Sequence, residues 1–93
     1  MAQKITWMPN AREDFRDIIH YLANEWGNTF AEEFTERVSK QLELIENHLF
    51  IGKQNEQFSS IRQLPVTKNY ILYYLVLHEE IIIVNLLHTN RKR

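Results

Sequence analysis

The side chains best suited to chemistry lie in the last third of the chain, between Ile61 and Arg93. A planar guanidinium such as that of Arg62 can bind phosphate or carboxylate, and a histidine such as His88 can act as a catalyst. The same third holds two adjacent tyrosines, a lysine near an expected turn, and a basic terminus. These further candidates are Tyr73, Tyr74, Lys68, Arg91, Lys92 and Arg93. The residue types favour an anion-binding surface with few candidates for proton transfer.

Each candidate also has an ordinary structural explanation. A single histidine near a strand end is more often a hydrogen-bonded structural residue, and strand tyrosines are usually half-buried with a hydrated hydroxyl. A basic terminus is most simply a solvated chain end. The four histidines are too dispersed for a zinc pattern, cysteine is absent, and no glycine-rich phosphate loop occurs. We therefore expect no metal and no cofactor.

The net charge of −1 conceals an asymmetry between the two parts of the chain. Residues 1–60 carry six Lys or Arg against ten Asp or Glu, whereas residues 61–93 carry five against two. The basic last third can contact phosphate or an acidic protein segment. Because the chain as a whole is slightly acidic, we do not expect it to bind nucleic acid tightly and independently of sequence.

Length and composition predict one domain that spans residues 1–93. A chain of 93 residues can bury about 60 to 65% of its unfolded surface around one core, which leaves no room for a second. The longest apolar stretches fall well short of the ~20 residues that a membrane helix needs. With no cysteine and no signal peptide at the first residues, we expect a cytoplasmic protein that does not enter a membrane.

Two amphipathic helices are predicted in the first half, after a short strand from Lys4 to Met8. Capping boxes at residues 10–13 and 29–32 predict where they begin, and Gly27 is suited to end the first. Each helix carries a single apolar stripe with spacings of three, four and seven. The stripes are Ala11, Phe15, Ile18, Ile19, Leu22 and Trp26 in the first helix, and Phe30, Phe34, Val38, Leu42, Ile45 and Leu49 in the second.

Beyond a polar loop from Phe50 to Ser60, the apolar period becomes two and predicts three strands. These run over residues 61–66, 70–77 and 81–88, and Pro65 favours an edge position or an irregularity in the first. We expect Phe50 and Phe58 to pack into the core. The fold class is therefore α+β, with the order β-α-α-β-β-β and a helical hairpin packed on one face of a mainly antiparallel sheet. The candidate polar residues are expected on the opposite, open face, although alternation does not decide which strand residues face the helices.

The order of these elements and their landmarks resembles the RelE/ParE superfamily of toxins from type II toxin–antitoxin modules, including the plasmid-stabilisation proteins. The resemblance covers nearly the whole chain. One departure is that the Pro-x-x-Gly usual after the second helix appears as Leu49-Phe50-Ile51-Gly52. The landmarks are Ala11, Phe15, Ile18 and Tyr21 in the first helix, Ala31 and Phe34 in the second, Arg62, the run from Tyr70 to Tyr74, and Ile82 to Arg91 with its His-x-x-Arg.

The resemblance implies a growth inhibitor that a cognate antitoxin neutralises, within a possible toxin–antitoxin hetero-oligomer. ParE-like members act on DNA gyrase, whereas RelE-like members are ribosome-dependent endoribonucleases that cleave mRNA. For RNA cleavage the resemblance implies His88 or Tyr74 for proton transfer and Arg62 and Arg91 as clamps on the phosphate.

Because the chain is slightly acidic and offers few such groups, the ParE-like function is favoured. The endoribonuclease is the alternative, and a non-toxic partner-binding member is a second alternative. In the favoured case Arg62, Lys68, Arg91, Lys92 and Arg93 are expected to serve binding, and the protein is not an enzyme.

Overall fold

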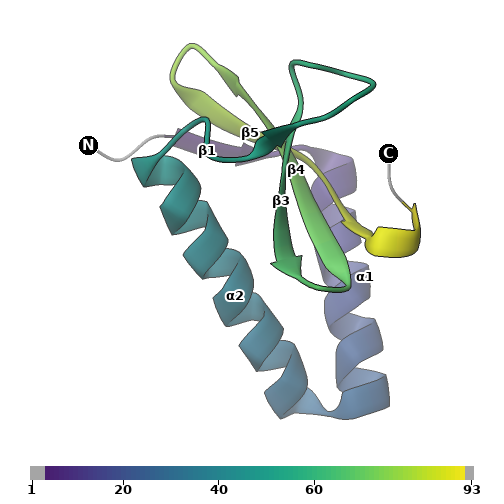
Figure 1. Cartoon of the computed structure of the whole chain (residues 1–93). Coiled ribbons are helices and arrows are strands. Elements are labelled where there is room, and N and C mark those ends of the chain that lie inside the picture. Colours follow the sequence, from purple (N-terminus) through teal and green to yellow (C-terminus); the bar gives the residue numbers. More distant parts are fainter. Residues whose placement is uncertain (1–3, 92–93) are drawn as a thin grey trace.

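Two helices pack on one face of a five-stranded sheet, in the predicted order with one additional short strand after the second helix (Figure 1). The computed structural model describes residues 4–91. Its elements are β1 (Lys4–Trp7), α1 (Pro9–Trp26), α2 (Asn28–Asn47), β2 (Lys53–Gln54), β3 (Arg62–Thr67), β4 (Tyr70–Leu77), β5 (Glu80–His88) and a 3₁₀ turn (Thr89–Arg91). The strand order is β1-β5-β4-β3-β2, with β1 parallel to β5 and the other pairs antiparallel. The predicted α+β fold is confirmed. No helix within residues 4–91 is long and apolar enough to cross a membrane.

Neither predicted capping box forms. The first helix begins at Pro9, which suits the first helical position, and the side chain of Asn10 donates to the Val84 carbonyl at 2.8 Å instead of capping. The second helix begins at Asn28, and its N-cap is Gly27. With φ at 99°, Gly27 ends the first helix and starts the second within one residue. The left-handed φ of this junction favours glycine, which has no side chain with which to cap α2.

The polar loop differs from the prediction in two ways. It contains the short strand β2, and its two phenylalanines are exposed rather than packed into the core, at 63% for Phe50 and 44% for Phe58. The loop is held instead by the buried side chain of Asn55. Its carbonyl oxygen accepts the backbone N–H groups of Gln57 and Phe58, and its amide donates to Gln63. Polar anchoring of the backbone therefore makes burial of the aromatic rings unnecessary.

A bulge in β5 decides which strand residues face the helices. The register between β4 and β5 pairs Tyr73 with Asn85 and Tyr74 with Ile83, so Val84 is an extra residue. The alternation predicted for the last strand is therefore wrong beyond this point, because Leu86 joins Ile81 and Ile83 in the helix-side core.

Helix α1 holds the bulge in place. One carboxylate oxygen of Asp14 accepts both the backbone N–H of Leu86 and the side-chain amide of Asn85, each at 3.1 Å. The strand β3 is irregular as well, with a register shift between Pro65 and Thr67. The partner strand β2 reaches only Arg62 and Gln63, so Pro65 lies at an edge, as predicted.

Candidate functional site

One tyrosine lies at the centre of one end of the contact between the helices and the sheet. We call this region the closed end and define it by Leu49, Gly52, Arg62 and Tyr74. Tyr74 is fully buried, its hydroxyl donates to the Leu49 carbonyl at 2.9 Å, and it accepts the Gly52 N–H at 2.9 Å. Arg62, its partner across the strands, donates from Nη1 to the Gly52 carbonyl at 2.7 Å and to the Phe50 carbonyl at 3.2 Å. The two side chains together fasten the chain that leaves α2 onto the sheet.

This arrangement leaves little of Tyr74 available for proton transfer. Burial raises the pKa of its hydroxyl, and the Gly52 amide and the Arg62 charge only partly offset that increase. The close fit also explains the glycine, because a Cβ at position 52 would lie 2.8 Å from Tyr74 Cε1 and 2.9 Å from its oxygen. In the sequence, Leu49-Phe50-Ile51-Gly52 stood out only as a family landmark without its proline.

At the other end of β4, His88 lies beside Tyr70. The two rings meet edge to face with centroids 5.2 Å apart, and His88 Nδ1 accepts the backbone N–H of Asn90 at 3.1 Å. Burial raises the pKa of the Tyr70 hydroxyl, and the neighbouring Tyr21 adds to the effect. His88 is therefore half-buried within an aromatic environment and holds the turn that follows β5.

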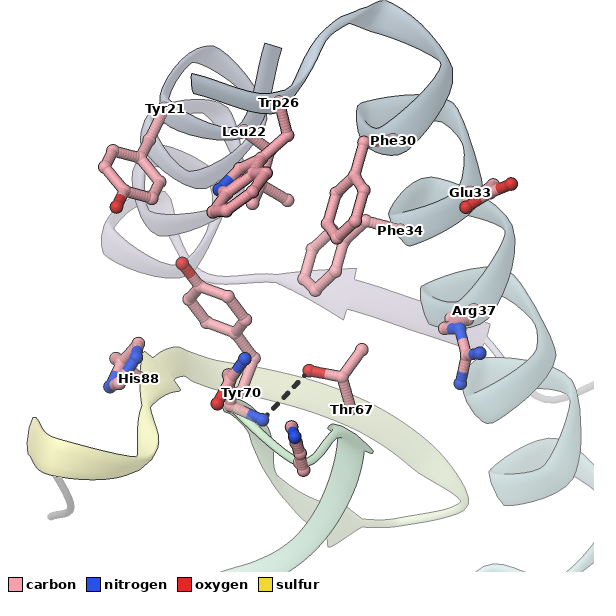
Figure 2. A pocket seen from close by; sticks show the side chains of 12 residues that line it. Tyr21, Leu22, Trp26, Phe30, Glu33, Phe34, Arg37, Thr67, Tyr70 and His88 are labelled. Carbon is pink, nitrogen blue, oxygen red and sulfur yellow. Dashed lines mark hydrogen bonds between the residues drawn. The ribbon is translucent and has the colours of Figure 1, made fainter. Parts of the chain in front are cut away.

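Tyr70 and His88 border a groove between the tip of the helical hairpin and the turn from β3 to β4 (Figure 2). The groove has a volume of about 840 Å³, and Leu22 and Phe34 lie among the residues that line it. We call this groove the open end; its remaining lining residues are Tyr21, Trp26, Phe30, Glu33, Arg37, Thr67, Lys68 and Asn69. Sequence reasoning placed Trp26 and Phe30 in the core, yet they are 65% and 47% exposed. The only signal in the sequence was that both apolar stripes continue to the very ends of the helices that meet at the hairpin tip.

The structure brings the candidate catalytic residues Arg62 and Tyr74 together but places His88 apart from them. Arg62 lies opposite Tyr74, and His88 lies opposite Tyr70, four positions away on β4. At about 3.3 Å per residue, these two strand positions lie roughly 13 Å apart along the backbone, well beyond hydrogen-bond reach. Lys68, exposed beside the β3–β4 turn, is near His88 rather than Arg62. The side chain of Arg91 and the residues Lys92 and Arg93 lie outside the described part of the chain.

The expectation of a polar open face is wrong for most of the sheet. Arg62, Tyr74 and His88 all lie on the helix side, because they align with Tyr74 or Tyr70 in the helix-side core. Only Tyr73, at 1% exposed, faces the opposite side. That face carries a second apolar cluster, made of Ile61, Ile71, Tyr73, Leu75, Ile82, Val84 and Leu87, with Gln63 beside Tyr73. Within residues 4–91, no cluster of three His, Asp or Glu residues could hold a metal ion.

Comparison with known proteins agrees with this geometry. The family model for the ParE toxin of the type II toxin–antitoxin system, parDE, matches residues 5–93. The solved chromosomal ParDE system from P. aeruginosa is similar in fold, with a TM-score of 0.78 at 16% identity over 94% of this chain and 96% of that chain.

Two further structures resemble the chain at a similar level. A YoeB/ParE toxin from Agrobacterium tumefaciens has a TM-score of 0.69 at 11% identity over 91% of this chain and 96% of that one. A chain of the YoeB–YefM complex from Staphylococcus aureus has a TM-score of 0.66 at 18% identity, over 94% of this chain and 97% of the other. No curated protein sequence gives a match. The resemblance to the RelE/ParE superfamily is confirmed.

Proposed function

We propose that this chain, which belongs to the ParE toxin family of type II toxin–antitoxin systems, stops growth by acting on DNA gyrase and is neutralised by a cognate antitoxin. Membership of the family makes it the toxin component of such a system. The target and the mode of action are the parts of the proposal that go further.

The proposal rests mainly on the hydrogen bonds of Tyr74 and Arg62, which both bind backbone groups of this chain. RNA cleavage by the 2′-hydroxyl needs a base, an acid and a cation within hydrogen-bond reach of one phosphate. The Tyr74 hydroxyl already makes two backbone hydrogen bonds and has no exposed surface, and the Arg62 Nη1 bridges two carbonyl groups. With His88 roughly 13 Å away along the strand, these three side chains do not form a nuclease centre. A toxin that binds its target needs no such centre.

The distribution of charge supports the same conclusion. A protein that docks among ribosomal phosphates gains affinity from many Lys and Arg contacts, and this chain has 11 Lys and Arg against 12 Asp and Glu. The acidic residues of the first 60 positions would also oppose such docking. Binding to a protein target such as gyrase does not depend on an excess of positive charge.

The test compares two activities of the purified full-length chain. We expect the chain to inhibit DNA supercoiling by purified gyrase, and to produce no cleavage of mRNA on translating ribosomes. In cells, expression without antitoxin should stop DNA synthesis before protein synthesis and induce the DNA-damage response.

The endoribonuclease alternative predicts the reverse outcome. Cuts would map to the ribosomal A site, supercoiling would be unaffected, and Arg62→Ala would abolish cleavage. Harmless expression in the absence of antitoxin would contradict both activities and favour a non-toxic partner-binding protein.

A further inference from the structure

The helical hairpin extends further than the sheet that it covers. The two helices reach beyond the β3–β4 turn, so that the tip of the hairpin overhangs the end of the sheet (Figure 1). Trp26 is the last residue of α1, Phe30 lies in the first turn of α2, and both side chains are largely exposed. Core-type side chains with no sheet beneath them are typical of a protein interaction surface.

The overhang is an apolar projection, and the groove beneath it is an apolar recess. Figure 2 shows the rings of Trp26 and Phe30 directed from the helices toward the groove, above Tyr70. The centroids of the Trp26 and Phe30 rings are 5.8 Å apart, and Phe34 meets Tyr70 edge to face at 5.2 Å. A surface that has both a projection and a recess of the same character can be complementary to itself. An isologous two-fold contact between identical chains requires this property.

The projection and the recess carry opposite charges. The groove is bordered by Lys68 in the β3–β4 turn and by Arg37 on α2, and among the described residues neither forms an ion pair or a hydrogen bond. The end of the hairpin, residues 17–36, contains no Lys or Arg. Its carboxylates are those of Asp17, Glu25, Glu32, Glu33 and Glu36.

Two of these carboxylates lie on the side of the hairpin tip that faces the groove. Glu25 follows the buried Ile18 by seven residues, which places it on the apolar stripe of α1. Glu33 lines the groove directly. Neither forms an ion pair with a residue that the structure describes, although Arg37 is one helical turn from Glu33. Both signs of charge at the open end are therefore without partners within the chain.

We propose that the open end is the interface of a two-fold homodimer, in which the hairpin tip of each copy inserts beneath the overhang of the other. The rings of Trp26 and Phe30 pack in the groove of the other copy, and the carboxylates at the tip lie against Lys68 and Arg37 there. Every contact occurs twice because the interface is isologous. The inference rests neither on the gyrase target nor on an antitoxin.

The charge pattern favours a second copy over other occupants. An uncharged small molecule would leave the two cations and the two carboxylates without partners. An acidic segment of a different protein would pair with Lys68 and Arg37 but would leave Glu25 and Glu33 unpaired and close to its own carboxylates. A second copy brings acids to the cations and cations to the acids in the same contact, which is the complementarity that gives an interface its specificity.

The test measures the mass of the full-length chain alone by analytical ultracentrifugation over a wide range of concentration. We expect a reversible equilibrium between monomer and dimer. Trp26→Ala should weaken the dimer roughly 30-fold or more, because an aromatic anchor is lost at two symmetric positions. The matched control Phe58→Ala removes another exposed ring outside the groove, and it should change the dissociation constant by less than about twofold.

A charge exchange then tests the direction of the contact. Lys68→Glu should weaken the dimer roughly tenfold or more, and less so at high salt. When Lys68→Glu is mixed with Glu25→Lys or with Glu33→Lys, at least one of the two mixtures should form a heterodimer about as stable as the unchanged dimer. The controls Lys53→Glu and Glu43→Lys reverse exposed charges away from the groove and should leave the dimer unchanged.

Three outcomes would overturn the proposal. A chain that stays monomeric at every concentration would leave the groove to an occupant of different chemistry. A dimer that Trp26→Ala does not weaken would place the contact elsewhere on the molecule. Failure of both mixtures to restore association would show that the tip of one copy does not meet the turn of the other. Thermal unfolding of each variant excludes loss of folding as the cause, and because gyrase is absent, these results are independent of the proposed function.

Discussion

The closed end and the open end of the helix–sheet contact hold similar residue types but use them differently. Each has a sheet tyrosine in the core and a basic side chain nearby. At the closed end Tyr74 is fully buried and has two backbone partners, and Arg62 bridges two carbonyls. At the open end Trp26 is 65% exposed, and Arg37 has no partner among the described residues. The two ends therefore differ in whether these side chains have intramolecular partners, and not in residue type.

The largest expected effect comes from truncating one aromatic side chain at each end. Tyr74→Ala should lower the free energy of unfolding by about 3 to 5 kcal/mol, because it creates a cavity and leaves the Gly52 N–H and the Leu49 carbonyl without their partner. Trp26→Ala should cost about 1 kcal/mol at most, because most of the ring is exposed and it loses mainly its contact with Phe30. Urea denaturation of the two variants measures both values. Similar losses for the two variants would contradict the division into closed and open ends.

A smaller effect is expected from adding one methyl group at the closed end. Gly52→Ala should destabilise the chain by about 1 to 3 kcal/mol, since its Cβ would meet Tyr74 Cε1 at 2.8 Å and Arg62 Cβ at 3.1 Å. The neighbouring substitution Ile51→Ala, at an exposed side chain, serves as the control and should change stability much less. In a Tyr74→Ala background the cost of Gly52→Ala should shrink, and a double-mutant cycle measures this coupling. Strict additivity would show that the two residues do not meet.

The element order and most boundaries could be predicted because hydrophobic periodicity is a local property of the sequence. The strands beginning at Tyr70 and the end of α1 at Gly27 are examples that the structure confirms. The side of the sheet that His88 faces could not be predicted, because the extra residue Val84 reverses the alternation. That bulge is held by Asn10 and Asp14, more than 70 positions away in the sequence. A period-two pattern contains no information about such a long-range hydrogen bond.

The open end shows a second reason for failure. The two apolar stripes correctly predict the helix faces that pack on the sheet. Trp26 and Phe30, at the ends of these stripes, are exposed because no sheet lies opposite them. Whether a partner surface exists at the hairpin tip depends on where β3 and β4 turn, at residues 67–70, and that relation is tertiary. The Phe50 ring was likewise predicted to pack into the core. It is exposed instead, and Arg62 Cζ lies over the ring, 5.1 Å from its centroid.

The smallest expected effect concerns how the free energy of unfolding responds to alkaline pH through one tyrosine at each end. Burial is the main cause that raises the pKa of both Tyr70 and Tyr74 above the ordinary value of 10.0. In the unfolded chain these hydroxyls lose their protons near pH 10, whereas in the folded chain they keep them to higher pH. The unfolded state therefore binds fewer protons in that interval, and the free energy of unfolding falls as pH rises above about 10. Below pH 9 this contribution is fully present and does not vary with pH.

Tyr74→Phe and Tyr70→Phe separate the two contributions. Each variant should show a shallower decline in unfolding free energy between about pH 9.5 and 11 than the unchanged chain, because one titrating hydroxyl has been removed. At neutral pH the two differ in another way: Tyr74→Phe should cost about 1 to 3 kcal/mol through its two unsatisfied backbone groups. Tyr70→Phe should cost less, since the Tyr70 hydroxyl makes no hydrogen bond to any residue that the structure describes. Urea denaturation across this pH range measures both terms, and an unchanged slope in Tyr74→Phe would mean that the Tyr74 hydroxyl ionises as easily folded as unfolded.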